Sequence, residues 1–216
     1  MSLALHTVFS LSIGIAAILA AVRLRAIPRA FLPFVLLLWA RFGAELAAAF
    51  LPATSDARTV LQNVVSLAEG LLLLWQFRRW DAFAGNRWIY PLLMALFCFV
   101  WTGETVAQPL RAVSPYYTLL CSITMAVASL HLLTCLLFER TGQLLPDPVF
   151  LVCLAFLLSF LFAVVMELFL VYGLQGSAGF RAGVRDLLSF VNLISNLLFA
   201  IAVLWIPRKP RYILQW

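Results

Sequence analysis

Seven long apolar stretches, separated by short segments rich in proline and arginine, follow one another along this chain of 216 residues. Each has about the 20 residues that an α-helix needs to cross a hydrocarbon layer about 30 Å thick. A transmembrane β-strand would instead alternate apolar and polar positions, whereas Phe150 to Met166 is apolar all round. The pattern predicts an all-α polytopic membrane protein, one seven-helix bundle with spans at 3–22, 31–51, 59–77, 88–107, 116–138, 149–172 and 186–206.

The composition agrees with this division. Hydrophobic residues make up 64% of the chain and charged residues 11%, against about 25% charged residues in soluble domains. Prolines avoid the interiors of the spans: Pro33, Pro91, Pro115 and Pro148 fall in or at first turns, where a helix tolerates proline. Little of the sequence is left for a soluble domain.

The distribution of basic residues predicts the orientation. The first stretch has no basic residue before it, so we expect it to stay as a helix and not to act as a cleaved signal peptide. The segments after the first, third, fifth and seventh spans carry Arg23, Arg25, Arg29, Arg78, Arg79, Arg87, Arg140, Arg208, Lys209 and Arg211. The opposite side carries Arg58, Arg111, Arg181 and Arg185.

By the positive-inside rule, the N-terminus is expected outside and the C-terminus in the cytoplasm. The formal charge of +6 then reflects topology and contact with the lipid bilayer, and it requires no nucleic-acid partner. Arginine far outnumbers lysine, and alanine and leucine are abundant. We therefore expect a multi-pass protein of a bacterial inner membrane.

Ionisable side chains inside the spans carry most of the functional information, because they are costly in lipid unless they face water, the bundle interior or a partner. Helix rise places Glu104, Glu167 and Glu45 within about 10 Å of the outer ends of their spans, and Arg41 and Glu69 about 15 Å deep. Arg41 is expected to pair with Glu45 or Glu69. The predicted ligand-binding residues are Glu45, Glu104, Glu167, Asp186 and Asn192, with Arg41 and Glu69 as a charged floor.

Two helices carry polar stripes at helical spacing. One runs along the third span through Gln62, Ser66, Glu69 and Gln76, and the other along the seventh through Asp186, Ser189, Asn192 and Asn196. Such residues serve either as hydrogen bonds between helices or as the lining of a water-filled, outward-facing cavity. The sequence leaves both interpretations open.

Several chemistries are excluded or disfavoured. A retinal Schiff base needs a lysine within a span, but the single lysine, Lys209, lies beyond the last one. His6 and His131 are at different depths, so one chain cannot ligate a haem with both. No hydrolase motif is present, the four cysteines read as buried apolar residues, and we expect no metal or cofactor. The chain is therefore not expected to be an enzyme, although an intramembrane acid/base enzyme using Glu104 and Glu167 is a less favoured alternative.

Two further patterns concern the surface of the bundle. Small residues recur every fourth position in the first two spans, which permits either packing inside the bundle or contact with another protein. Aromatic belts are expected at the cytoplasmic interface from Trp75, Trp80, Trp88 and Trp205, and at the outer one from Tyr116, Tyr117 and Tyr172.

The segments EGLLLLWQFRRW, from Glu69 to Trp80, and NLISNLLFAIAVLWIP, from Asn192 to Pro207, resemble a group of uncharacterised bacterial seven-helix membrane proteins associated with sensor kinases. The resemblance implies a role in sensing. With the outer polar pocket, it predicts a membrane-embedded sensor or accessory subunit that binds a small or lipidic ligand and acts through a membrane or signalling partner. The alternative is an ion- or proton-coupled transporter, in which His131 would relay protons.

Overall fold

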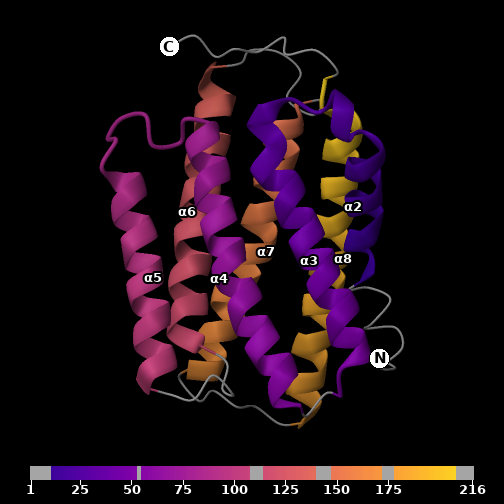
Figure 1. Cartoon of the computed structure of the whole chain (residues 1–216), viewed down its shortest axis with the longest axis vertical. Helices are drawn as coiled ribbons and strands as arrows, with labels where there is room; N and C mark the ends of the chain where they lie inside the picture. The colour runs from indigo at the N-terminus through magenta and orange to yellow at the C-terminus, as the bar shows by residue number, and fades with distance from the viewer. Residues whose placement is uncertain (1–10, 53–54, 108–113, 140–146, 172–177, 208–216) are drawn as a thin grey trace.

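The structure, a computed structural model, describes residues 11–52, 55–107, 114–139, 147–171 and 178–207, and these form a bundle of antiparallel helices (Figure 1). Two short 3-10 turns, Leu24–Ala26 and Arg29–Phe31, connect the first two helices. The α-helices are α2 (Ile13–Val22), α3 (Leu32–Phe50), α4 (Asp56–Arg79), α5 (Ile89–Ala107), α6 (Pro115–Glu139), α7 (Pro148–Val171) and α8 (Ala178–Trp205).

Six of these helices, α3 to α8, are long and apolar enough to cross a membrane, as in a multi-pass membrane protein. α2 covers only the second half of the first predicted span, whose beginning lies outside the described residues. The predicted and observed bounds of α3, α5, α6 and α7 agree closely. α8 is the exception, because it begins at Ala178, two turns before the predicted start at Asp186.

The helices form a closed ring in chain order, with α8 packed against α2. Phe34 of α3, Phe77 of α4, Phe156 of α7 and Phe199 of α8 meet across the middle of this ring, with ring centroids 5.1 to 6.2 Å apart. These four residues, hereafter the aromatic layer, are fully buried. They lie toward the upper end of the bundle in Figure 1, where α3 begins and α4 ends.

α2 is held against α3 and α8 by small residues and by its C-terminal end. Ala16 and Ala20, two members of its ridge of small residues, are completely buried in the monomer, so this ridge packs internally. Trp39 Nε1 of α3 donates a 3.1 Å hydrogen bond to the Ala17 carbonyl. The Arg23 guanidinium donates to the carbonyls of Val203, Leu204 and Ile206, and a cation at that position stabilises the C-terminal end of α8.

α5 lies at the periphery of the bundle, where it packs against α4 and α6. Phe97 is its one buried residue. In contrast, α4 and α6 approach closely at Gly70, where a Cβ atom would overlap the hydroxyl of Tyr117. The fold therefore combines a tightly packed ring with one largely uncovered helix.

The structure corrects part of the aromatic-belt prediction. Trp88 and Trp205 are exposed at the upper end of the bundle, but Trp80, predicted for the same belt, is buried against Phe31 and Phe77. Tyr116 is exposed at the opposite end, whereas Tyr117 points into the bundle and is fully buried. Successive residues of a helix differ in direction by about 100°, so only one of these two tyrosines can face outward. The predicted belt residue Tyr172 lies outside the described part of the chain.

Candidate functional site

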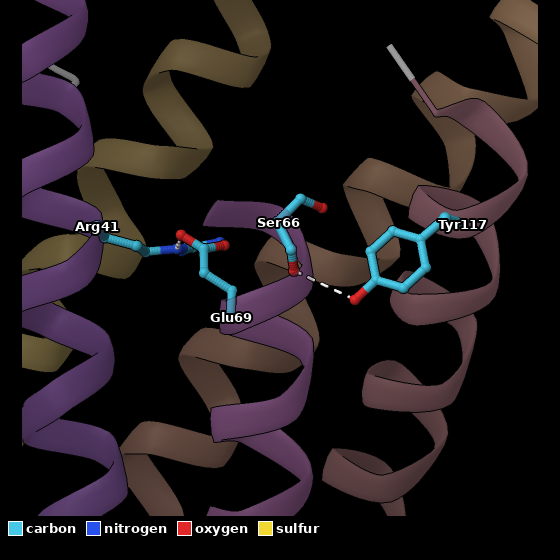
Figure 2. Close-up of polar contacts among 4 residues, drawn as sticks. All are labelled: Arg41, Ser66, Glu69 and Tyr117. Atoms are coloured by element: carbon cyan, nitrogen blue, oxygen red, sulfur yellow. Dashed lines mark hydrogen bonds and ion pairs between the residues drawn. The ribbon is translucent and has the colours of Figure 1, made fainter. Parts of the chain in front are cut away.

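The centre of the candidate site is an ion pair between α3 and α4. Arg41 Nε lies 2.9 Å from Glu69 Oε1, and Figure 2 shows the arginine side chain reaching across to the carboxylate. The sequence placed these two residues at the same depth on neighbouring helices, and the structure brings them together. Their side chains are 28% and 19% exposed, so the pair faces an accessible space and is not sealed within the core.

That space is a cavity of about 240 Å³ in the half of the bundle below the aromatic layer. α2, α3, α4, α7 and α8 all contribute to its wall. Its polar lining consists of Arg41, Glu45, Gln62, Ser66, Glu69, Ser159, Asn192 and Asn196. Of the seven residues predicted for the ligand site and its floor, Arg41, Glu45, Glu69 and Asn192 are among these lining residues.

Helix geometry explains why the polar groups and the aromatic layer are separate. Arg41 lies two turns beyond Phe34 on α3, which is about 10 Å along the helix axis. Glu69 lies a similar distance from Phe77 on the antiparallel α4. On α8, Asn196 and Asn192 lie one and two turns below Phe199, on the same side of the aromatic layer as Arg41 and Glu69. The cavity therefore meets packed phenyl rings on its upper side.

The polar stripe of α8 contributes both to the cavity and to packing. Asn196 Nδ2 donates a 2.8 Å hydrogen bond to Ser12 Oγ, at the start of α2, and so fixes its amide at the cavity wall. Ser189 and Ser195 are buried and do not line the cavity. The stripe thus contributes both a hydrogen bond between helices and part of the cavity wall.

α4 links the cavity to the other side of the bundle. The Tyr117 hydroxyl of α6 donates a 3.2 Å hydrogen bond to the carbonyl of Ser66, a residue of the cavity wall (Figure 2). One turn earlier, the carbonyl of Asn63 accepts a 3.1 Å hydrogen bond from Trp101 Nε1 of α5. A displacement of α4 at the cavity would therefore act directly on α5 and α6.

The structure corrects the prediction that Glu104 lines the same cavity. Glu104 lies at the end of α5 and accepts hydrogen bonds from the backbone N–H groups of Tyr116, at 2.9 Å, and Tyr117, at 2.8 Å. These are two of the donors that the first turn of a helix leaves without intrahelical partners. Glu104 is thus a cap for α6, which accounts for its charge without a ligand.

Three other predicted residues are also absent from the cavity lining. Glu167 lies near the end of α7, within electrostatic reach of Glu104. Asp186 lies in the third turn of α8, since that helix begins earlier than expected. His131 lies on the exposed surface of α6, with Nε2 3.9 Å from Cys135 Sγ. The five predicted ligand residues therefore do not form one site.

Gln76 is a structurally important residue whose role the sequence did not show. Its Oε1 accepts a 2.7 Å hydrogen bond from the Phe34 N–H, and its Nε2 donates a 2.8 Å bond to the Ala30 carbonyl. It therefore caps α3 from the neighbouring α4. The polar stripe along the third span contained the signal, but both partners of Gln76 are backbone groups that sequence patterns do not mark.

Within the described ranges, no group of three or more His, Cys, Asp or Glu side chains is arranged to hold a metal ion. Comparison of the chain with protein-family models, curated proteins and solved structures gives no match. The resemblance to seven-helix proteins associated with sensor kinases therefore stays a prediction, and function has to be argued from the cavity itself.

Proposed function

We propose that this protein is a membrane-embedded sensor or accessory subunit, which binds a small polar or cationic ligand in the cavity beside Arg41 and Glu69 and acts on a partner protein. The observation that carries the proposal is the combination of a charged cavity with the aromatic layer on its upper side. A polar cavity bounded by packed rings is suited to holding a ligand, whereas a conduction path would require polar groups on both sides of that layer.

The size of the cavity limits the ligand. About 240 Å³ is less than the roughly 300–1,000 Å³ of sites for drug-sized molecules. Amide and hydroxyl groups from Gln62, Ser66, Ser159 and Asn192 surround the space and supply both donors and acceptors. These features favour a compact ligand with several polar atoms.

The charges of the wall favour a cation over an anion. Two carboxylates, Glu45 and Glu69, line the cavity with one guanidinium, Arg41, which is paired with Glu69. Glu45 lies one helical turn from Arg41 and is exposed. The wall thus has an excess of one negative charge, which an ammonium group would neutralise.

The links through α4 support the proposed action on a partner. A ligand that draws in Ser66 or Glu69 shifts the carbonyls to which Tyr117 and Trp101 are bonded. Trp101 belongs to α5, whose outer surface is largely uncovered. A ligand can shift the conformational equilibrium only by as much as its affinities for the two states differ, and these contacts are a physical route for that coupling.

Thiol labelling tests the cavity even while its ligand is unidentified. Ser159→Cys, in a background with Cys98 and Cys135 replaced by serine, is expected to react faster with a cationic methanethiosulfonate than with an anionic one of similar size. Glu45→Gln should reduce that preference, because it removes the excess negative charge. The matched control is Ser129→Cys, buried on α6 and absent from the cavity lining, which should react with neither reagent.

Equally slow reaction of Ser159→Cys with both reagents would show a dry, closed space and refute the proposal. Ion flux in proteoliposomes that depends on Glu45 would favour transport instead. The partner is tested separately by purification from native membranes in mild detergent. A sole species of monomer mass there would overturn the partner half of the proposal.

A further inference from the structure

A second cavity lies at the upper end of the bundle, on the turn that connects α4 to α5. It has a volume of about 560 Å³ and is lined by Arg78, Asp81, Phe83, Ala84, Arg87, Trp88, Tyr90 and Pro91. None of these residues lines the cavity beside Arg41. On α4 the two linings are separated by the stretch from Glu69 to Arg78, about 13 Å along the helix axis, so the function of the second cavity can be tested independently.

The turn that carries this second cavity is fixed to the core. Trp80 and Ala82 are buried, and Trp80 packs edge-on against Phe31 at 5.7 Å. Between them, Asp81 adopts a φ of 56°, a left-handed conformation that Asp tolerates better than most residues. The Ala82 N–H then bonds to the Phe77 carbonyl at 3.0 Å. The side chains around the cavity are thus presented from a defined backbone.

Two arginines stand over aromatic rings at the rim of this cavity. Arg78 Cζ lies 4.5 Å from the centroid of the Tyr90 ring, and Arg87 Cζ lies 5.9 Å from that of Trp88. Within the part of the chain that the structure describes, neither guanidinium forms an ion pair with a carboxylate. Stacking on a ring restrains each side chain while its N–H donors stay available to another acceptor.

We propose that this cavity binds the phosphate group of an anionic headgroup, with Arg78 and Arg87 as the two ligating residues. Guanidinium groups recognise phosphate through paired N–H donors. Asp81 also lines the cavity and offsets one of the two positive charges. The site therefore suits a group with one negative charge, such as a phosphodiester.

The surface of α5 identifies a phospholipid as the source of that phosphate. Trp88, the residue before α5, and Leu92 and Phe99 on the helix are 69%, 68% and 77% exposed, and their spacing places them along one side of it. Trp88 is also part of the cavity wall. A headgroup bound at the arginines would thus have its acyl chains beside a continuous apolar stripe, with Trp88 at the interface, where tryptophan is enriched.

Native mass spectrometry of the purified full chain tests the site with defined probes: phosphatidylglycerol, phosphatidylcholine and inorganic phosphate. We expect retention of phosphatidylglycerol over phosphatidylcholine, and about tenfold weaker retention when Arg78→Gln and Arg87→Gln are combined. The matched control combines Arg25→Gln and Arg29→Gln, which removes two exposed arginines at the same end of the bundle but outside the cavity. That control should retain phosphatidylglycerol as the unmodified protein does.

An equal loss of phosphatidylglycerol in both double variants would overturn the proposal, because attraction to diffuse positive charge would then explain binding. Equal retention in all three proteins would overturn it as well. Displacement of the lipid by inorganic phosphate at an equal concentration would contradict the lipid source, although the Arg78 and Arg87 contacts would stand. If the double variant does not fold, Arg87→Gln alone, an exposed position on the turn, supplies the same comparison.

Discussion

Replacing Glu104 with alanine removes both carboxylate oxygens from the start of α6, and the expected loss can be worked from its two contacts. Hydrogen bonds to a charged group contribute about 1.5–3 kcal/mol each. Tyr116 is 58% exposed, so water can replace the carboxylate at its N–H. Tyr117 is completely buried, and its N–H would lose its Glu104 acceptor. We therefore expect a local destabilisation of about 2–3 kcal/mol, mostly from Tyr117.

Amide hydrogen exchange of the protein in lipid nanodiscs measures this directly. A loss of about 2 kcal/mol corresponds to roughly 30-fold faster exchange at the start of α6. Glu104→Gln keeps one acceptor oxygen and should give an intermediate rate. Thr105→Ala is the control, because the Thr105 hydroxyl donates a hydrogen bond within α5, to the Thr102 carbonyl at 2.9 Å. Unchanged exchange at Tyr116 and Tyr117 in Glu104→Ala would refute the capping role.

Three further predictions concern packing and topology. Gln76→Leu leaves the Phe34 N–H and the Ala30 carbonyl without their partner and should lower the free energy of unfolding by about 1–3 kcal/mol. Gln62→Leu, at an exposed position, should change that free energy little, and equal effects of the two variants in denaturant titrations would contradict the capping role of Gln76. Gly70→Ala forces α4 away from Tyr117 and should lower the free energy of unfolding by about 1–3 kcal/mol. Gly103→Ala, whose Cβ meets nothing within 4 Å, should leave that free energy unchanged or raise it in the same titration. A reporter fused to the C-terminus should be active in the cytoplasm, and periplasmic activity would reverse the predicted orientation.

The fold was largely predictable because lipid imposes a simple rule on sequence. Every backbone polar group inside the membrane must be satisfied within its segment, so apolar runs of about 20 residues become helices. The rule fails where a helix leaves the membrane. α8 continues back to Ala178 through Arg181 and Arg185, because outside the hydrocarbon layer a helix can include charged residues. Hydropathy gives the extent of a span, not the extent of its helix.

The candidate site was predictable only in part. Arg41 and Glu69 could be matched because antiparallel neighbours of similar length bring equal depths together. Depth does not give direction around the bundle, and Glu104 had the expected depth but faces the start of α6. The sequence shows that a charge must be compensated, but it does not show a backbone N–H as the compensating group. Capping residues between helices are therefore easily mistaken for ligand residues.

The aromatic layer also bears on the choice between binding and transport. A continuous polar path past the cavity would have to hydrate Phe34, Phe77, Phe156 and Phe199, all now fully buried. Exposing a buried side chain of this kind costs about 1.5–3 kcal/mol, so opening the layer would cost on the order of 6–12 kcal/mol. A transporter must recover that energy from its substrate or coupling ion in every cycle. A binding protein needs only a shift of α4 of the kind that Ser66 and Tyr117 can transmit, and this smaller requirement favours the sensor over the transporter.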